Sequence, residues 1–387
     1  MVYIIGSWET FHRRQMLEAL ARNMEKKGFL FCCSFPCSIK EAWQDPRQLK
    51  KRGILPLFGP QQVAENIFIG TPCVWIPGIA RHAGQANSLS WRMVSIQIKR
   101  ALKNIAPNEC FKIAWVYKPE HLYCLGLIEE DMTIYECYDE YQLDYFNSNP
   151  LPQVALLENE LLMRANMVFI TSKSLLKRGE AWKKKIFYAP NGVSFNHFVN
   201  AFNHKPLEST VIVSIPKPRL GFVGNISRFL DLKLIEEIAR KKTNWSLILI
   251  GPVDESAKQI VEKWASIPNI YLLGRVDFCH LPLYLKDFDV ALAPFQWNEL
   301  CYHINPLKVW EYLAAGKPVV ASLMSELESL SDIIYLARDR NSFLKQVENA
   351  LESNNLDRIQ RGIHEAEKHS WNQLTASMLD LILSEIK

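Results

Sequence analysis

NELCYHINPLKVWEYLAAGKPVVAS, residues 298–322, is the stretch that decides the fold prediction. Its first residues are polar and predict a loop. Pro306 then fits the first turn of a helix, where a missing N–H costs no hydrogen bond. Gly316 supplies the helix stop, and the apolar run after Pro318 predicts a short buried strand. A loop, a helix and a buried strand in this order indicate an α/β fold.

The predicted helix carries one cation and one anion on the same face. Lys308 and Glu311 lie three positions apart, so both can reach one bound object. The amino-terminal amides of the helix and the lysine favour a phosphate group. The carboxylate can accept both hydrogens of a ribose diol. The stretch therefore predicts a cradle for a nucleoside diphosphate.

The segment PLKVWEYLAAGKPVV, residues 306–320, resembles the donor-site segment of GT-B glycosyltransferases of family 4 (group 1). Three further stretches agree with that family in the same order: YAPNGVSFNHF at 188–198, LGFVGNI at 220–226 and WSLILIGP at 245–252. The resemblance spans nearly the whole chain. It implies an α/β fold of two Rossmann-like, doubly wound domains that face each other across a cleft.

The chain departs from the family at one position of this segment. The family carries two glutamates eight positions apart; Glu311 matches the second, and His303 occupies the first. Glu299 is nearby but out of register. The resemblance places the position of His303 near the donor sugar.

The alternation of strands and helices predicts the domain organisation. We expect an acceptor-binding domain over 1–203, a proline-rich linker over 204–219 and a nucleotide-sugar-binding domain over 220–370. The last helix, 371–387, is expected to pack back on the first domain, as the resemblance implies.

Composition limits the class of protein. With 387 residues, the chain can form two ordinary domains. A net charge of +4 does not suggest a nucleic-acid partner, but it suits anionic nucleotides or an anionic membrane surface. Nine scattered cysteines without a CxxC pair indicate reduced, mostly buried thiols. No run reaches membrane-spanning length, and no signal peptide is evident. We expect a cytoplasmic protein, peripheral at the inner face of the membrane.

Two segments of the first domain carry expectations of their own. Residues 88–105 predict a basic amphipathic helix, which either lies on a membrane surface or, as we prefer, buries one side against a sheet. An antiparallel hairpin is expected around residues 66–69 and 73–76.

Polar residues follow two successive predicted strands of the first domain. His121 follows the strand 112–117, and Asp139 and Glu140 follow the strand 133–138, so these side chains are expected in one crevice. The resemblance implies that the second of these strands lines the acceptor side. His121 could equally be an ordinary loop histidine, and Asp139 the N-cap of the next helix.

The turn after the first strand opens at Gly6. Trp8 and Arg13 follow it and could face the same crevice. The alternative is that Gly6 only makes a turn and Arg13 is only solvated. The acceptor-binding candidates are Gly6, Trp8, Arg13 and Glu140, and the catalytic candidates are Asp139, His121 and Lys308.

The donor site is expected in the second domain. Gly224 and Gly251 follow strands and allow a close backbone approach to a phosphate or sugar. Where the family supplies an arginine and a lysine after the first of these glycines, this chain has Asn225 and Arg228. The donor-binding candidates are Gly224, Asn225, Arg228, Gly251, His303, Asn305, Leu307, Lys308 and Glu311.

No metal or cofactor is expected. The D-x-D of Asp287 and Asp289 precedes a buried strand, which it is expected to start, and GT-B enzymes generally need no divalent metal. Lys308 and backbone amides would stabilise the leaving diphosphate. Asp139 would act as base if the reaction inverts, but retention is usual in the resembling family.

The predicted function is transfer of a sugar, of the hexosyltransferase type, from a nucleoside-diphosphate sugar to a carbohydrate or lipid-linked hydroxyl in polysaccharide or glycoconjugate synthesis. Two alternatives stay open: a sugar-nucleotide epimerase on the same fold, and a non-catalytic sugar-nucleotide-binding protein, which His303 favours. The sequence argues against a dehydrogenase, because the loop after the first strand lacks the glycine spacing of a dinucleotide site.

Overall fold

The computed structural model divides into two compact units. It describes residues 2–4, 8, 11, 13–25, 28–34, 36–38, 53–74, 85–106, 110–126, 128–144, 149–179, 186–203, 210–353 and 355–386. The first unit comprises Met1–Ala189 and Leu374–Lys387, and the second comprises Pro190–Gln373.

The first unit is built on an eight-stranded sheet in the order β10-β9-β8-β7-β1-β2-β5-β4. Its strands are β1 (Val2–Ile4), β2 (Leu30–Cys33), β4 (Gln61–Ala64), β5 (Ile67–Gly70), β7 (Ile113–Val116), β8 (Met132–Cys137), β9 (Met167–Ile170) and β10 (Ile186–Tyr188). All neighbouring pairs are parallel except β4 with β5. The strand order reverses between β1 and β7, and folds of this kind bind ligands at such a switch point.

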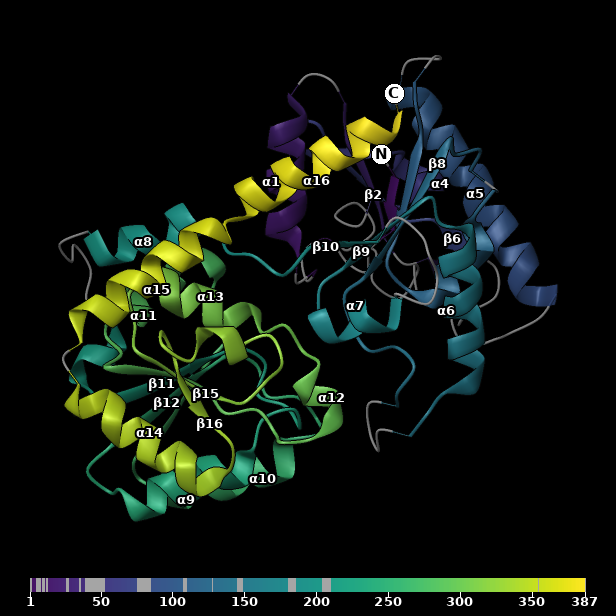
Figure 1. Cartoon of the computed structure of the whole chain (residues 1–387). Coiled ribbons are helices and arrows are strands. Elements are labelled where there is room, and N and C mark those ends of the chain that lie inside the picture. The colour runs from purple at the N-terminus through teal and green to yellow at the C-terminus, as the bar shows by residue number, and fades with distance from the viewer. Residues whose placement is uncertain are drawn as a thin grey trace. The chain divides into compact units, whose positions relative to one another are not determined.

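Helices flank this sheet on both sides (Figure 1). They are α1 (Arg14–Met24), α4 (Leu55–Phe58), α5 (Gln85–Ile105), the 3₁₀ helix η3 (Pro119–Cys124), α6 (Pro152–Arg164) and α7 (Lys173–Gly179). One core cluster joins α5, η3 and α6 to the strands through Trp91, Leu122 and Leu161. The apolar stripe of α5 is buried, which confirms that this segment is a domain helix packed on its sheet.

The expected hairpin of residues 66–69 with 73–76 is wrong. β5 pairs antiparallel with β4, which precedes it, and parallel with β2. The next strand, β6 (Cys73–Val74), instead pairs with β3 (Cys37–Ser38) in a separate two-stranded sheet. Two short apolar runs close in sequence suggested local pairing, but the partners of both lie further back in the chain.

The second unit is built on a six-stranded sheet in the order β13-β12-β11-β14-β15-β16. Its strands are β11 (Arg219–Val223), β12 (Ser246–Ile250), β13 (Ile270–Gly274), β14 (Val290–Ala293), β15 (Val319–Ser322) and β16 (Tyr335–Ala337). All pairs are parallel, and the order reverses between β11 and β14. This is the doubly wound order of dinucleotide-binding folds. Sequence reasoning missed β16, which has three residues and no alternating pattern.

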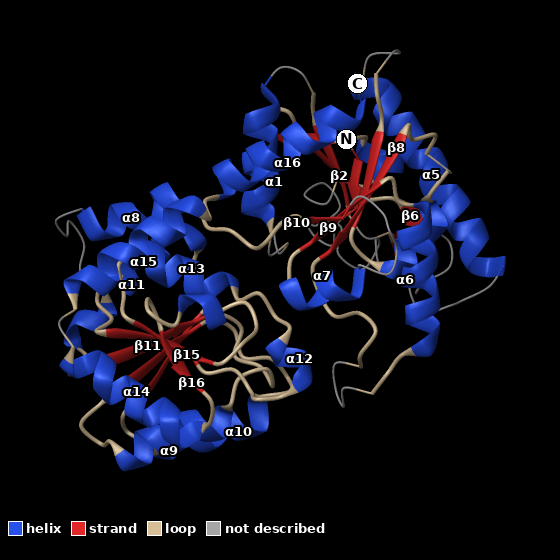
Figure 2. Ribbon diagram, in the orientation of Figure 1, coloured by secondary structure: helices blue, strands red, loops and turns tan. Residues whose placement is uncertain are grey.

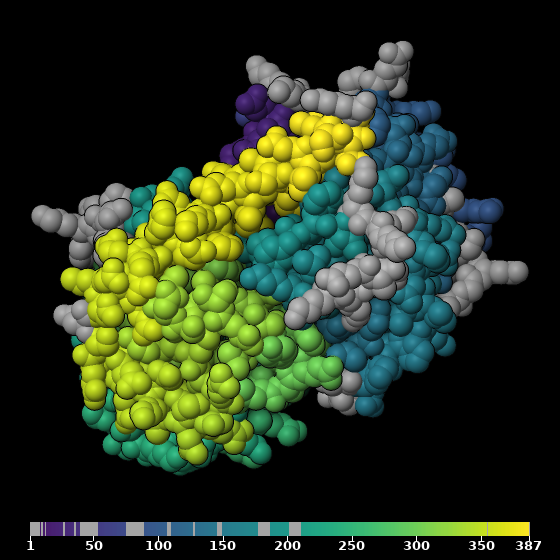
Figure 3. Space-filling model, viewed as in Figure 1, coloured from purple at the N-terminus to yellow at the C-terminus, as the bar shows by residue number. Residues whose placement is uncertain are grey.

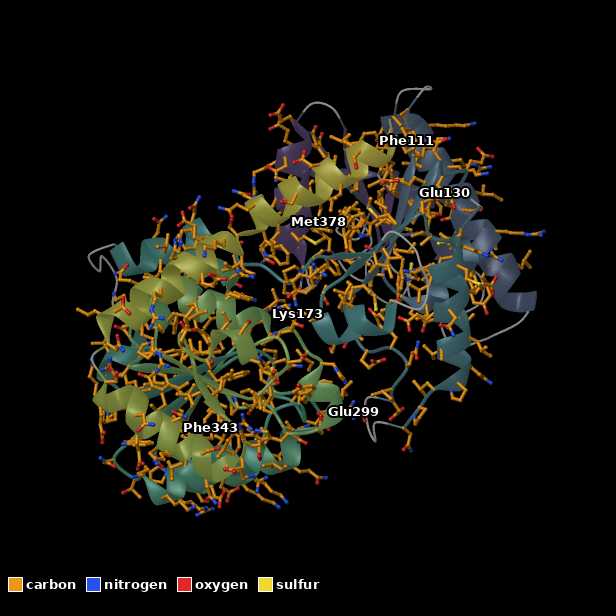
Figure 4. All side chains as sticks on the ribbon, in the orientation of Figure 1. Phe111, Glu130, Lys173, Glu299, Phe343 and Met378 are labelled. Carbon is orange, nitrogen blue, oxygen red and sulfur yellow. The ribbon has the colours of Figure 1, made fainter. Side chains whose placement is uncertain are left out.

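Helices cover both faces of this sheet as two separate layers (Figure 2). One layer holds α9 (Leu232–Lys241), α10 (Lys258–Lys263), η6 (Trp264–Ser266) and α14 (Arg340–Glu352). The other holds α8 (Phe195–Asn203), α11 (Leu281–Leu285), α13 (Leu307–Ala314) and α15 (Leu356–Lys368). The remaining short elements are η5 (Val211–Ser214), η7 (Phe278–His280), α12 (Glu299–Tyr302) and η8 (Glu328–Leu330). Each layer has its own core cluster; Phe343 of α14 points into the first (Figure 4) and Trp310 of α13 belongs to the second.

The division between the units differs from the expected linker at 204–219. α8 contacts α11, α13 and α15, and its Phe198 lies in the core of the second unit. Ile212 and Ile215 are buried in the same core, so residues from 210 onward pack as part of this unit. Residues 204–209 lie outside the described residues.

The last helix, α16 (Trp371–Ile386), runs from the second unit into the first. Its residues from Leu374 onward belong to the first unit, where Asn23 of α1 donates a hydrogen bond to Thr375 at 2.8 Å. In the space-filling view its yellow atoms lie against the purple atoms of α1 (Figure 3).

All nine cysteines are free thiols, and six of them are buried. None of the described helices is long and apolar enough to cross a membrane.

Candidate functional site

Residues 298–322 fold at the switch point of the second unit. The loop after β14 leads through α12 to α13, next to the end of β11. α13 begins at Leu307 with Pro306 as its N-cap, one residue later than the sequence suggested. The backbone N–H of Val223 donates to Tyr312 Oη at 2.8 Å, which joins α13 to the residue before Gly224. The expected strand-end glycine and the expected helix therefore belong to one local structure.

Lys308 and Glu311 contact each other on this helix. Lys308 Nζ lies 2.9 Å from Glu311 Oε2 and 3.2 Å from Oε1. The lysine side chain is 29% exposed and the glutamate side chain 10% exposed. The carboxylate is thus nearly buried and held in place by its neighbour, while the ammonium group keeps access to solvent and to an anion. Leu307 beside them is half-buried.

The two strand-end glycines are required by the backbone. Gly224 has φ +153° and Gly251 has φ +146°. A Cβ atom added to Gly251 would lie 1.8 Å from the carbonyl oxygen of Gly224. Only glycine at residue 251 allows the ends of β11 and β12 to approach so closely. The result is a close contact of two backbone segments at the carboxyl edge of the sheet, where Gly251 is buried and Gly224 is partly exposed.

Arg228, in the segment after Gly224, lines a cavity that Lys308 does not line. Asn225 is exposed, and Arg228 is half-buried with its guanidinium carbon 5.3 Å from the Phe229 ring centroid. Arg228 and Lys233 line a cavity of about 660 Å³ between the starts of α9 and α14. Among the described residues that line it, neither Lys308 nor Glu311 occurs. A larger cavity, of about 920 Å³, lies along β16 and includes none of the expected site residues.

His303 and Asn305 lie on the turn between α12 and α13. His303 caps the end of α12, and its ring packs edge-on against Tyr302 with centroids 5.5 Å apart. His303 Nδ1 is buried and meets no hydrogen-bond partner among the described residues. Asn305 is 6% exposed, and its carbonyl oxygen accepts a hydrogen bond from Asn191 Nδ2 at 2.8 Å. Glu299 is exposed on α12 (Figure 4).

Asn191 is a residue whose place in this site the sequence did not reveal. The Asn-Gly pair at 191–192 predicted only a turn. Its side chain is instead buried against the loop that precedes α13, 114 positions further along the chain. Its presence in a segment resembling the family was the one available signal.

Asp139 and Glu140 follow β8 in the first unit, as expected. Asp139 Oδ1 accepts the backbone N–H of Glu140 at 2.9 Å, and Glu140 Oε1 accepts that of Gln142 at 3.2 Å. Gln142 Nε2 donates to the fully buried Glu158 at 2.6 Å, and Tyr135 Oη donates to the same carboxylate at 2.7 Å. Hydrogen bonds to the buried Glu158 thus fix the segment 139–142 in place. Asp139 is half-buried and Glu140 buried, so Asp139 is the more accessible of the two carboxylates.

Two expected site residues lie in the interior of the first unit instead. Arg13 is 0% exposed and forms an ion pair with Glu136, which is also 0% exposed, at 2.5 Å. It is therefore neither solvated nor open to an acceptor in this structure. The carboxylate also accepts a hydrogen bond from Trp115 Nε1 at 2.8 Å. A buried ion-pair role replaces the expected acceptor role of Arg13.

His121 is likewise 0% exposed, on η3. Its ring packs edge-on against Tyr117 and Trp91. Burial, with a smaller contribution from Lys118, lowers the pKa of His121 to about 3. A neutral histidine inside the core is not placed to exchange protons with a substrate, so the catalytic role expected for it is corrected. Trp8 is 6% exposed beneath the guanidinium of Arg14, and Gly6 lies outside the described residues.

The D-x-D residues make structural contacts. Asp289 accepts the backbone N–H of Arg219 at 2.8 Å and pairs with Lys217 at 3.0 Å, which ties the starts of β14 and β11 together. Asp287 accepts a hydrogen bond from Thr210 at 3.1 Å. Among the described residues, no group of three or more His, Cys, Asp or Glu side chains is placed to hold a metal ion.

Comparison with known proteins finds a family model that matches part of the second unit. Residues 217–353 match the model of glycosyl transferases group 1. A relative is TuaH of Bacillus subtilis (strain 168), which its name assigns provisionally to teichuronic acid biosynthesis as a glycosyltransferase. It is 27% identical over 218 residues, which are 54% of each chain. The chain thus matches about half the length of this curated relative.

Solved structures resemble the whole chain in fold. Sucrose-phosphate synthase from Thermosynechococcus elongatus has a TM-score of 0.70 at 14% identity, over 100% of this chain and 98% of that one. An alpha,alpha-trehalose-phosphate synthase (UDP-forming) from Burkholderia vietnamiensis has a TM-score of 0.69 at 12% identity, over 99% of each chain. Anabaena Alr3699/HepE, in complex with UDP, has a TM-score of 0.66 at 11% identity, also over 99% of each chain. The chain has the GT-B fold of these proteins, and the resemblance drawn from the sequence is confirmed.

Proposed function

We propose that this chain, a GT-B protein whose residues 217–353 match the group 1 glycosyltransferases, transfers a sugar from a nucleoside-diphosphate sugar to a hydroxyl acceptor. One observation carries the proposal. A lysine in the first turn of a helix and a glutamate one turn further on contact each other at the switch point of a doubly wound sheet, and Tyr312 of the same helix joins it to Val223, the residue before the strand-end glycine. This arrangement presents a cation and free amides to a phosphate and a carboxylate to a diol.

The leaving group sets the chemistry that these residues must supply. As the bond from the sugar to the diphosphate breaks, negative charge grows on the phosphate oxygens. Lys308 and the amides at the start of α13 stabilise that charge more strongly in the transition state than in the ground state, which lowers the barrier. No metal ion is needed for this step in the proposed mechanism.

The acceptor side is assigned to the end of β8. Asp139 is the accessible carboxylate there, and it orients or deprotonates an acceptor hydroxyl. We propose retention of configuration, in which the acceptor attacks from the face of the leaving group and the diphosphate takes the proton. The acceptor is proposed to be a carbohydrate hydroxyl of a growing polysaccharide, a choice supported by the name of the Bacillus relative.

The proposed donor carries uridine diphosphate. Two of the similar structures support this choice, since one was solved with UDP and another is a UDP-forming synthase. A thermal-shift screen of UDP, ADP, GDP and dTDP tests it, because a ligand that binds only the folded state raises the melting temperature. If none of the four raises it, the proposal fails.

Substitution of the cradle tests the assigned residues. Lys308→Ala and Glu311→Ala should each weaken UDP binding about tenfold or more, as expected for loss of a charge-assisted contact. Lys368→Ala is the matched control, because Lys368 forms the same three-apart pair, with Glu365 at 3.0 Å, on α15 of the same unit. Wild-type affinity in either cradle variant would count heavily against the site.

His303 favours one competing function, a protein that binds a sugar nucleotide without transferring the sugar. It stands where the family has a glutamate, and its Nδ1 has no partner among the described residues. Incubation with a donor alone and with mixed acceptors separates the possibilities. Transfer product supports the proposal, an epimer formed from donor alone indicates an epimerase, and binding without turnover supports the competing function.

We also propose that the first unit binds an anionic membrane surface through α5. Leu89 is 58% exposed and Ile96 is 50% exposed, and Arg92, Arg100 and Lys103 are exposed on the same stripe of the helix. The helix contains no acidic residue. An exposed stripe of aliphatic and basic side chains complements anionic lipid headgroups.

Vesicle sedimentation tests this surface. The protein should bind vesicles containing phosphatidylglycerol and not vesicles of phosphatidylcholine alone, and Ile96→Asp should reduce the binding. Leu356→Asp is the control, since Leu356 is 66% exposed on α15 of the second unit. Equal binding by the two variants would refute the assignment to α5.

A further inference from the structure

Asn191 is held in the interior of the second unit although the chain around it is irregular. Its side chain is 7% exposed, and its Nδ2 donates a buried hydrogen bond to the carbonyl oxygen of Asn305 at 2.8 Å. Its Oδ1 is also buried and has no partner among the described residues. When a buried carboxamide donates its hydrogen bond to a single backbone carbonyl, it constrains the position of that carbonyl.

The carbonyl in question belongs to the residue immediately before the cap of α13. Because Pro306 follows, the backbone of Asn305 is confined to extended conformations. The side chain of Asn305 is fixed as well, since its Oδ1 accepts a hydrogen bond from Trp310 Nε1 at 3.5 Å. Any shift of the Asn305 carbonyl is therefore transmitted to the first turn of α13, which carries Lys308.

The segment that carries Asn191 is itself anchored. The N–H of Val193 donates to the carbonyl of His369 at 3.0 Å, and the N–H of Trp371 donates to the carbonyl of Val193 at 3.0 Å. His369 stacks on Trp310 with ring centroids 3.8 Å apart and planes 13° apart. Three segments are thus connected to one another at the start of α13: residues 191–193, 305–310 and 369–371.

We propose that Asn191 is a positioning residue for nucleotide binding: its carboxamide fixes the Asn305 carbonyl and thereby the amino-terminal turn of α13. This inference rests on the proposed function, since it assumes that α13 holds the diphosphate. Asn191 itself touches no reacting atom. It acts through the placement of Lys308 and of the free amides beside it.

Replacement by aspartate gives a sharp test. Asn191→Asp keeps the shape of the side chain, and a protonated carboxyl can donate to the Asn305 carbonyl as the amide does, but a carboxylate cannot. Burial raises the pKa of such a carboxyl, so the change falls within a usable pH range. The ratio of the UDP dissociation constants of variant and wild type should be about tenfold near pH 8 and fall toward one near pH 5.5. UDP ionises to the same extent in both measurements, so the ratio of the two dissociation constants is free of the pH dependence of UDP itself.

Asn269 supplies the matched control. It is also 7% exposed in the second unit, and its Nδ2 donates to the backbone carbonyls of Ala239, Lys242 and Trp245. Asn269→Asp should lower the melting temperature and leave the ratio of UDP dissociation constants near one at every pH. A purely structural role for Asn191 would give the same result in both variants.

A second variant covers the case in which Asn191→Asp does not fold. Asn191→Ala removes the donor without adding a charge, so UDP binding should weaken about tenfold at every pH. A ratio near one for Asn191→Ala, or a ratio for Asn191→Asp that does not change with pH, overturns the inference while wild-type binding stands. If wild-type protein binds no nucleoside diphosphate, the proposed function fails first, and the inference fails with it.

Discussion

At the scale of single residues, ionisable groups divide into those held inside the first unit and those held at the edge of the second. Arg13, Glu136 and Glu158 are fully buried, and each is met by a charged or hydrogen-bonding partner. Burial of this kind fixes neighbouring segments at a cost in desolvation, and removing one partner would leave a charge uncompensated. Lys308 and Glu311 on α13 differ, because the lysine remains partly exposed and a ligand can replace its contact with the nearly buried glutamate.

The buried histidine predicts a pH dependence of stability. Because burial lowers the pKa of His121 to about 3, the unfolded state takes up a proton first as the pH falls. Its contribution is fully present above about pH 6.5, the pKa of an unfolded histidine, and is lost as the pH drops from there toward the folded value. The free energy of unfolding should fall by about 2 kcal/mol from this source between pH 7 and pH 5.

Urea unfolding at the two pH values measures this loss. His121→Phe keeps an aromatic ring in the core and removes the titrating group, so its free energy of unfolding should change less between pH 7 and pH 5. If wild type and variant lose the same amount, His121 is not the cause.

At the scale of elements, the ends of β11 and β12 show how a strand terminus becomes a site. The backbone N–H of Gly224 donates to the carbonyl of Ile250, and that of Gly251 donates to the carbonyl of Gly274. The strand ends are thereby held together without side chains between them. A backbone edge without side chains is the feature that sugar and phosphate groups can approach closely.

Gly251→Ala should therefore destabilise the second unit strongly. The added methyl group would lie 1.8 Å from a backbone oxygen, and φ is +146°. We expect a loss of at least about 3 kcal/mol in the free energy of unfolding, measured by urea titration. Gly274→Ala is the control: φ is +69°, but nothing lies within 4 Å of the added atom, so the expected loss is about 1 kcal/mol. Similar losses in the two variants would show that the close approach is not rigid.

At the scale of the whole molecule, the first unit is discontinuous in sequence. Residues Leu374–Lys387 complete a unit that otherwise ends at Ala189. Met378 of α16, marked in Figure 4, is 4% exposed, and Ile382 one turn later is 1% exposed. Residues 374–387 thus contribute buried apolar side chains to the first unit, so this unit cannot be completed before they have been synthesised.

Ile382→Ala should destabilise the first unit and not the second. Removal of a buried isoleucine side chain costs about 2–4 kcal/mol, and native-state hydrogen exchange should show the loss in α1 and in α16 while the amides of β11 and β12 keep their protection. Leu383→Ala is the control, because Leu383 is 50% exposed and its loss should stay within about 0.5 kcal/mol. Lost protection in β11 would contradict the assignment of α16 to the first unit.

The sequence predicted what depends on near neighbours in the chain. The alternation of apolar strands and amphipathic helices predicted the α/β class, and the three-residue spacing of Lys308 and Glu311 predicted that they share a face of the helix, where the structure places them 2.9 Å apart. The two glycines after β11 and β12 could be recognised from their place at strand ends. Local periodicity and backbone sterics act over a few residues, so a single chain displays them directly.

Only the tertiary structure decided which polar residues are buried and which distant segments meet. Arg13 finds Glu136 and His121 finds a closed core because α1, η3 and β8 pack together, and no local pattern records those neighbours. The contact of Asn191 with Asn305 spans 114 positions and depends on how α8, α13 and α15 are layered. Packing determines how far each polar side chain is removed from water, and therefore whether it lies in the core or in an accessible site. The extent of this burial is defined only in the folded chain.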